Sequence, residues 1–190
     1  DENKNLILEQ DKTSKFGKVL EIDIDTLDYE IFSYGHRNPQ GLYYDVINDL
    51  VLETEHGPQG GDELNILEKN SNYGWPISSY GEHYDGKFRK NAPLNKSHID
   101  FGFIEPIKYW TPGIGISQIT KSFETKNIYL ISSMKNKSIY EINLNLDTNF
   151  FEISKVLEVG QRIRDIVAVE SKKIYLLFLE KPSRIAILNF

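Results

Sequence analysis

The feature that most constrains the fold is a regular alternation of short β-rich runs and polar turns, with almost no helical periodicity. Val, Ile, Tyr, Phe and Leu dominate the runs, and Asn, Asp, Gly, Lys and Ser separate them. Many short strands at regular spacing are typical of a sandwich, a barrel or a propeller. The expected strands are 18–24, 30–34, 41–46, 50–53, 63–67, 116–120, 127–132, 138–144, 151–156, 164–169, 173–179 and 184–188.

The last third of the chain contains a weak repeat. The stretches NIYLISSMKNKSIYEINL and KKIYLLFLEKPSRIAILNF each contain a strand, a polar turn with Lys, and a second strand. Their Ile-Tyr pairs, at 128–129 and 174–175, lie 46 residues apart. Propeller blades repeat with a period of about 40–50 residues, so this spacing favours a propeller.

Composition narrows the possible functions. The chain of 190 residues is long enough for one domain with a real core, and 39% of its residues are hydrophobic. A net charge of -6 argues against nucleic acid as the main partner, because phosphate binding needs a basic surface. The absence of cysteine excludes disulfides, thiolate metal sites and a cysteine nucleophile. No stretch of the sequence approaches the roughly 20 apolar residues of a membrane span.

The segment 68–115 differs from the rest because it is rich in Gly, Pro, Asn and aromatic residues and has few clean strand patterns. Long irregular segments inside a compact domain are usually functional or disordered. The many Tyr, Trp and Phe side chains disfavour disorder. We therefore expect a packed loop that lines a pocket.

Three polar motifs could bind a ligand. Arg37 and Asn38 stand between a Gly and a Pro and offer rigid donors, although a surface turn explains them equally well. The Gly/Pro-rich stretch 55–63 could aim carbonyl and carboxylate oxygens at a cation such as Ca²⁺, or be a flexible hairpin loop. Arg162 and Arg164 alternate around Ile163, so both leave one face of an extended segment, where they suit a polycarboxylate or are simply solvated.

Taken together, the motifs resemble the glucose/sorbosone dehydrogenase family of soluble aldose sugar dehydrogenases that depend on pyrroloquinoline quinone (PQQ). The matching strings occur in family order and extend essentially from end to end of the chain. They are GKVLEI, YGHRNPQGL, ETEHGPQGGDELNIL, NYGWP, PIKYWTPGIGIS, SMKNKSIYEI and GQRIRDI. Several unrelated motifs in the right order are far more specific than any one of them.

The resemblance implies an all-β fold, a six-bladed β-propeller. At about 45 residues a blade, this chain has enough residues for about four blades. We therefore expect a single domain, residues 1–190, that corresponds to the C-terminal part of such a propeller. The first residue is Asp rather than Met, which also indicates a cut start.

The resemblance also implies roles for particular residues. Arg37 and Asn38 match the pair that contacts the quinone oxygens of PQQ, and Arg37 is the residue assigned to catalysis. The carbonyls of Gly57 and Pro58 match ligands of the Ca²⁺ that touches PQQ, while Glu63 and Tyr73 match ligands of a further Ca²⁺. The remaining cofactor contacts that the resemblance implies are Tyr84, Lys135, Lys137, Arg162 and Arg164.

The implied activity is PQQ- and Ca²⁺-dependent oxidation of an aldose at C1 to the lactone, in the periplasm or outside the cell. The family's catalytic His lies upstream of the first matching strand, so none of the four histidines here takes its place. We therefore expect the chain to carry the cofactor-binding half and to be inactive alone. The alternatives are a non-catalytic propeller module that binds a protein or glycan, and a structural fragment in which Arg37, Lys135, Arg162 and Arg164 do not converge.

Overall fold

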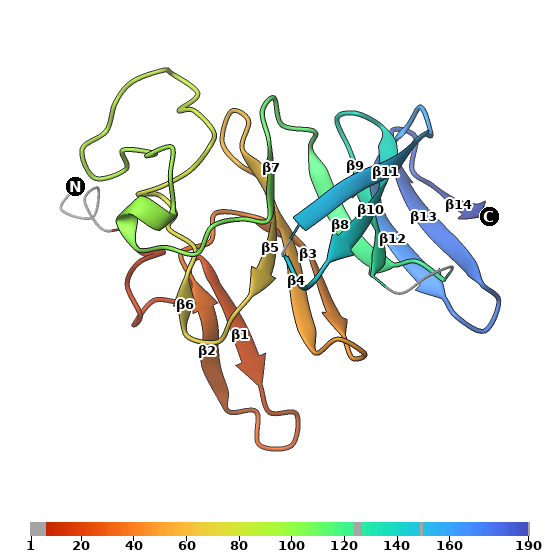
Figure 1. Cartoon of the computed structure of the whole chain (residues 1–190), viewed down its shortest axis with the longest axis horizontal. Coiled ribbons are helices and arrows are strands. Elements are labelled where there is room, and N and C mark those ends of the chain that lie inside the picture. The colour runs from red at the N-terminus through yellow and green to blue at the C-terminus, as the bar shows by residue number, and fades with distance from the viewer. Residues whose placement is uncertain (1–6, 124–126, 149, 190) are drawn as a thin grey trace.

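The computed structural model describes residues 7–123, 127–148 and 150–189, and its architecture is four small sheets that follow one another along the chain (Figure 1). The first sheet has the order β1-β2-β6, and the second has the order β3-β4-β5-β7. The pair β2–β6 is parallel, whereas the other pairs of these two sheets are antiparallel. Their strands are β1 (Lys18–Ile22), β2 (Tyr29–Tyr34), β6 (Ser71–Asn72), β3 (Pro39–Asp45), β4 (Leu50–Glu55), β5 (Asp62–Leu67) and β7 (Lys108–Trp110).

The other two sheets are antiparallel and come from the C-terminal half. The third has the order β11-β10-β9-β8 and the fourth has the order β12-β13-β14. Their strands are β8 (Ile116–Lys121), β9 (Ile128–Ser133), β10 (Ser138–Asn145), β11 (Phe150–Glu158), β12 (Arg162–Val169), β13 (Ile174–Glu180) and β14 (Arg184–Leu188). Adjacent small sheets in which successive strands pair are the arrangement of neighbouring propeller blades.

The strand pattern of the sequence is confirmed by the structure. All twelve expected strands are present, with ends within two residues of the expected ones. The sequence did not reveal β6 and β7, which have only 2 and 3 residues, or the 3₁₀ turn Ile99–Phe101. Such short elements exist because a neighbouring strand pairs with them, so they carry no alternation of their own.

The 46-residue repeat corresponds to two successive sheets. Tyr129 lies in β9 and Tyr175 in β13, and each strand is the second of its sheet along the chain. Both tyrosines are only 1% exposed. The repeated Ile-Tyr pair therefore marks the same buried position in two blades.

The apolar core lies between neighbouring sheets. One buried cluster joins β4, β5 and β7 to β8, β9 and β10 through residues such as Leu64, Ile119 and Ile131. A second joins β9 and β10 to β12 and β13 through residues such as Ile139 and Ile163. Burying one such side chain is worth about 1.5–3 kcal/mol, so these two clusters hold three of the four sheets together.

The long segment between β5 and β8 is packed, as the sequence predicts. Tyr73, Gly74, Pro76 and Ser78 are buried within it, and Tyr80 stacks on Tyr109 with ring centroids 3.7 Å apart. Several of its residues line the cavities described below. Among the described residues, no helix has the length and apolar character needed to cross a membrane.

Candidate functional site

The hairpin formed by β4 and β5 presents two faces of different chemistry. On one face, Leu52 lies opposite Ile66 and Thr54 opposite Leu64, and we call this the apolar face. On the other, Glu53 lies opposite Asn65 and Glu55 opposite Glu63, and we call this the acidic face. The period of two along each strand separates the faces. All four residues of the acidic face are buried.

Glu55, on the acidic face, holds the turn that carries Arg37 and Asn38 in place. The backbone N–H groups of Arg37 and Asn38 donate to Oε2 of Glu55 at 2.7 and 3.1 Å. The Arg37 guanidinium donates to the carbonyl of His56 at 2.8 Å and lies over the Trp75 ring, 5.2 Å from its centroid. A half-buried, well-supported guanidinium is therefore presented at one end of β3.

Burial alone raises the pKa of Glu55, but other interactions outweigh it. His36, whose Nδ1 lies 3.6 Å from Oε1 of Glu55, and the N–H groups of Arg37 and Asn38 lower the pKa of Glu55 below its usual value. The carboxylate is thus held in its charged form. It acts as an anchor for the turn rather than as a group that exchanges protons.

The Gly/Pro loop between β4 and β5 is held by a second buried carboxylate, Asp62. This residue accepts hydrogen bonds from the N–H groups of Gly57, Gly115 and Ile116 at 3.2, 2.7 and 3.1 Å. A Cβ at position 57 would lie 2.0 Å from the carbonyl oxygen of Gly60, so only glycine fits there. Within the described part of the chain, no hydrogen bond ends on the carbonyl oxygens of Gly57 or Pro58.

The two loops meet around one cavity of about 350 Å³. Tyr84 reaches it from the long segment, and Lys135 reaches it from the turn between β9 and β10, where its Nζ donates to the carbonyl of Gly113 at 2.9 Å. We call this cavity the seat. Its lining residues are Arg37, Asn38, His56, Gly57, Pro58, Gln59, Gly60, Asp62, Tyr84, Gly113, Gly115 and Lys135. A volume of this size is within the range of small-molecule sites.

A second cavity, of about 540 Å³, lies beside the seat and shares Arg37, Pro58 and Tyr84 with it. Its other side is formed by the long segment, including Trp75 and Arg89. Arg89 donates to Nδ1 of His83 at 2.6 Å and pairs with Asp85 at 3.0 Å. Tyr84 is 74% exposed, so its ring is a wall between two open hollows rather than part of the core.

Arg162 and Arg164 lie at the edge of this region and not in the lining of the seat. Both guanidiniums bond to the carboxylate of Glu180, from Nε at 3.1 and 2.6 Å, so both leave the same face of β12 as the alternation predicts. Arg164 also donates to Gln40 at 3.3 Å, and Gln40 donates to the Asn38 side chain at 3.0 Å. The contacts of Lys137 are those of its carbonyl, which accepts from the N–H groups of residues 159 and 160.

The positive charges of Arg37 and Arg164 both act on His56. Burial is the main reason that the pKa of His56 is lowered, and the positive charges of Arg37 and Arg164 lower it further, although Asp62 opposes them. Nε2 of His56 bonds to the carbonyl of Ile116 at 2.6 Å, so the neutral ring is the donor there. Two guanidiniums from sheets far apart in sequence therefore act on one point at the seat.

Glu63 and Tyr73 lie below the seat, around a small enclosed cavity. Its volume of about 10 Å³ suits one water molecule or ion, and Glu55 and His98 also line it. Burial, followed by the charges of Glu55, Glu105 and Asp62, raises the pKa of Glu63 well above its usual value, although Asn65 opposes this. The hydroxyl of Tyr73 donates to the carbonyl of Ile66 at 2.7 Å and accepts from the N–H of Glu68 at 2.9 Å.

Sequence reasoning missed the supporting acids. It treated Glu55 and Asp62 only as parts of a Gly/Pro loop, and it left Glu53 within a plain strand. The available signal was the run ETE at 53–55, which places two acids on the same face of a strand whose other face is apolar. Only the packing of His36 and the long segment against that face shows that these acids are buried.

Comparisons with known proteins agree with the fold and the motifs. The sequence matches the family description Glucose / Sorbosone dehydrogenase over residues 2–187. It is 35% identical over 142 residues to the aldose sugar dehydrogenase YliI of Escherichia coli, covering 72% of this chain and 38% of that protein. The chain thus spans less than half the length of this curated relative.

Two solved structures support the propeller fold. The soluble aldose sugar dehydrogenase of Escherichia coli in its apo form superposes with a TM-score of 0.81 at 27% identity, covering 98% of this chain and 58% of that one. The PQQ-bound aldose sugar dehydrogenase of Streptomyces coelicolor gives a TM-score of 0.70 at 22% identity, covering 95% and 54%, and supports the fold alone. The four sheets are therefore part of a β-propeller, and the chain belongs to the glucose/sorbosone dehydrogenase family.

Proposed function

We propose that this chain forms the cofactor seat of a PQQ- and Ca²⁺-dependent dehydrogenase that oxidises aldose sugars at C1 to the lactone. The observation that carries the proposal is the meeting of Arg37, Asn38, Pro58, Tyr84 and Lys135 around one cavity. These residues come from four separate parts of the sequence. The relatives described as aldose sugar dehydrogenases support the substrate class.

The residues present fit a flat polycarboxylate quinone. Lys135 offers a cation at one side of the seat, and Arg162 and Arg164, which share Glu180 as their ion-pair partner, lie at its edge. Arg37 offers a guanidinium at the other side, held in place by His56 and Trp75. Cationic donors suit carboxylates and quinone oxygens, and the exposed Tyr84 ring offers a stacking wall. Lys137 is part of the proposal because of its position in the SMKNK motif.

The Gly57–Pro58 loop fits a hard cation. Its two carbonyl oxygens are not used by other hydrogen bonds of the described residues, and Asp62 fixes the loop that presents them. Calcium takes 6–8 oxygen ligands, so a bound cofactor would have to supply some of them. We propose that these carbonyls hold Ca²⁺ at the edge of the seat.

Glu63 and Tyr73 fit a second Ca²⁺ below the seat. A cation there would relieve the repulsion that raises the pKa of the buried Glu63. Because the Tyr73 hydroxyl already donates and accepts a hydrogen bond, we propose that its carbonyl is the ligand. This ion would tie β5 to the start of the long segment.

The chemistry is divided between the cofactor and this chain. PQQ, when bound, supplies a two-electron acceptor for the hydride from C1 of the sugar. Arg37 stabilises negative charge at the oxygen that it faces, and its support by Glu55 and His56 means that little reorganisation is needed. We propose that the base that takes the proton of the sugar hydroxyl is a histidine outside this chain. We also propose that the protein is periplasmic or extracellular.

A binding titration tests the proposal. PQQ is added to the purified chain with excess Ca²⁺, and quenching of tryptophan fluorescence is followed. We expect saturable binding that EDTA abolishes, and a loss of affinity of about 10–100-fold for Arg37→Ala and Lys135→Ala. Arg184→Ala removes an exposed arginine from β14 and should bind like the original chain.

Two results would count against the proposal. Absence of Ca²⁺-dependent PQQ binding would favour the alternative of a non-catalytic propeller module that binds a protein or glycan. Equal weakening by Arg184→Ala and Arg37→Ala would indicate a general charge effect. An assay of glucose oxidation with an artificial electron acceptor then tests activity separately, and turnover by this chain alone would contradict the proposal of an external base.

A further inference from the structure

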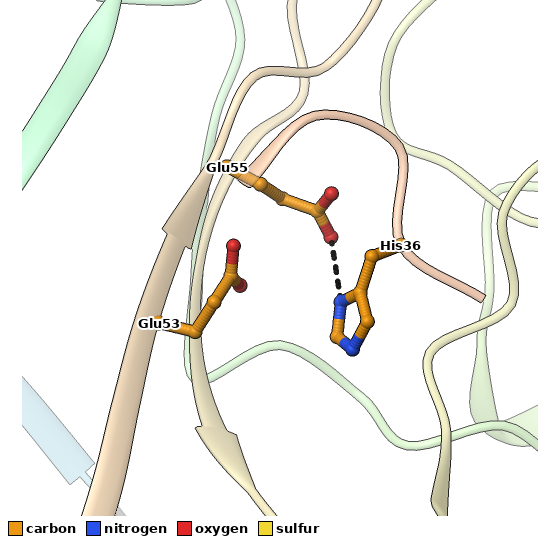
Figure 2. A group of neighbouring side chains, drawn as sticks. All are labelled: His36, Glu53 and Glu55. Atoms are coloured by element: carbon orange, nitrogen blue, oxygen red, sulfur yellow. Dashed lines mark ion pairs between the residues drawn. The ribbon is translucent and has the colours of Figure 1, made fainter. Parts of the chain in front are cut away.

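The acidic face contains a group of three side chains, His36, Glu53 and Glu55, of which the proposed function uses only Glu55, as the anchor of the Arg37 turn. One ligand atom from each lies within 4.8 Å of the others, and the three side chains point toward one another between β4 and the turn after β2 (Figure 2). His36 and Glu53 are fully buried, and Glu55 is 4% exposed. We propose that this group is a binding site for a divalent transition-metal cation such as Zn²⁺, separate from the two calcium sites.

Each of the three side chains has one atom fixed by a neighbour and one atom turned toward the centre. Nε2 of His36 bonds to Oγ of Ser33 at 2.8 Å, Oε2 of Glu53 accepts from Asn65 at 3.0 Å, and Oε2 of Glu55 accepts from the Arg37 and Asn38 N–H groups. Metal-binding imidazoles and carboxylates are usually oriented by such a second bond. With the proton on Nε2, the lone pair of His36 Nδ1 faces the two acids.

The atoms turned inward lack ordinary hydrogen-bond partners. Among the residues that the structure describes, Nδ1 of His36 and Oε1 of Glu53 are buried with no partner, and so is Oδ1 of the adjacent Asn65. Nδ1 of His36 lies 3.6 Å from Oε1 of Glu55, which is too long for a hydrogen bond. Ligand atoms about 2.1 Å from a tetrahedral Zn²⁺ lie about 3.4 Å apart, so this separation suits two ligands of one ion.

The charge of the site also calls for a cation. Two carboxylates are buried side by side on one strand face, and no hydrogen bond from the described residues reaches Oε1 of Glu53. Stacking of the His36 ring on Tyr73, with centroids 4.7 Å apart, closes the group from solvent. Buried charges need a compensating partner, and a divalent ion neutralises both acids at once.

The donor set distinguishes this site from the calcium sites. Ca²⁺ takes oxygen ligands almost exclusively, whereas an imidazole nitrogen with two carboxylates suits Zn²⁺ and related ions. We propose Oδ1 of Asn65 as a fourth ligand, because it is buried without a hydrogen-bond partner among the described residues and the same amide bonds to Glu53. The inference does not rest on the proposed function, because the side-chain atoms that would bind the metal do not contact the seat.

Metal analysis of the full chain tests the inference. The protein is stripped with EDTA, saturated with Ca²⁺ to fill oxygen sites, and titrated with Zn²⁺ in a calorimeter. We expect one Zn²⁺ per chain, an affinity at least 10-fold lower for Glu53→Gln, and an unchanged Zn²⁺ affinity for Glu152→Gln. Glu152→Gln is the control, because it makes the same substitution at an exposed glutamate of β11, away from the site.

A second measurement does not depend on how well a variant folds. Titration of the stripped original chain with Co²⁺ should produce the visible absorption bands of a low-coordinate, nitrogen-ligated ion, and Zn²⁺ should displace them. Zn²⁺ should also raise the melting temperature by about 5 °C. Absence of both the bands and Zn²⁺ binding in the presence of Ca²⁺ would overturn the inference. Equal loss of Zn²⁺ in both variants would overturn it too.

Discussion

The two faces of the β4–β5 hairpin share one backbone, and they differ in what they contribute. The apolar face places Leu52, Leu64 and Ile66 in the cluster that joins the second sheet to the third. The acidic face places Glu53, Glu55 and Glu63 against His36 and His98, with several polar atoms left without partners. The first face contributes stability, whereas the second uses buried charge to hold the loops of the seat.

This division has a physical basis. Apolar contacts are non-directional and tolerate small shifts, so they stabilise sheets without fixing any one atom. Buried carboxylates cost free energy unless they are paired, but a charge-assisted hydrogen bond fixes a backbone N–H closely. Glu55 fixes the backbone N–H of Arg37 in this way, and the proposed role of Arg37 needs such a fixed position.

The largest effect is expected on the apolar face. Leu64→Ala removes a side chain that is 2% exposed, and we expect it to lower the free energy of unfolding by about 3–4 kcal/mol through lost burial and a cavity. Urea denaturation followed by circular dichroism measures this. Leu42→Ala, in the neighbouring strand β3 and 52% exposed, is the matched control and should change it by less than about 1 kcal/mol. A similar loss from both would disprove the assignment of the core.

Asp45 is a buried acid with hydrogen-bond partners, and it can be compared with the acids of the acidic face. Asp45 is 1% exposed and bonds to Lys121 and Tyr129, each at 2.6 Å. Burial alone raises the pKa of Asp45, but the bonds from Lys121, Tyr129 and Asn48 outweigh it, so the net pKa is lowered. We expect Asp45→Asn to cost about 3 kcal/mol at pH 7, because Lys121 loses its charged partner.

The direction of the pKa shift of Asp45 determines how this loss of stability depends on pH. A lowered pKa means that Asp45 stabilises the fold above its unfolded pKa, near 4, and that the contribution is lost as pH falls below that value. Urea denaturation at several pH values should therefore show the original chain and Asp45→Asn approaching each other in acid. A constant difference down to pH 3 would contradict the ion pair.

The acidic face should respond less strongly to loss of one charge. Glu55→Gln keeps the shape but weakens the bonds from the Arg37 and Asn38 N–H groups, and we expect a loss of about 2 kcal/mol together with weaker PQQ binding. Denaturation and the fluorescence titration measure the two effects. Glu152→Gln changes an exposed glutamate in β11 and should alter neither. Unchanged PQQ affinity in Glu55→Gln would show that the turn does not need this anchor.

The smallest effect is expected for Glu53→Gln in metal-free protein. Its pKa is raised well above its usual value, so acidic solution favours the uncharged form of Glu53, and the change in stability should be smallest at low pH, below about 1 kcal/mol. A raised pKa also means that the original chain loses stability as pH rises through that value, while the variant does not. Denaturation in EDTA at pH 6 and pH 9 should show the variant gaining relative stability at pH 9, and the opposite trend would disprove the raised pKa.

The sequence predicted the strands well because alternation of side chains is a local property. Runs such as 138–144 and 174–179 alternate clearly, and the structure contains them nearly as expected. The sequence also identified the loops that hold Arg37, Pro58, Tyr84 and Lys135. It could not show that Arg162 and Arg164 both bond to the carboxylate of Glu180, because that residue lies on the neighbouring strand β13.

By itself, the sequence determined that the chain is all-β with a blade-like period, that it has no cysteine chemistry, and that its motifs follow the glucose/sorbosone dehydrogenase pattern. Only the tertiary structure decided which polar residues are buried. Glu53 and Glu152 look alike in sequence, yet one is fully buried beside His36 and the other is exposed. The reason is that burial depends on which segments pack against a strand face, and those segments are far away along the chain.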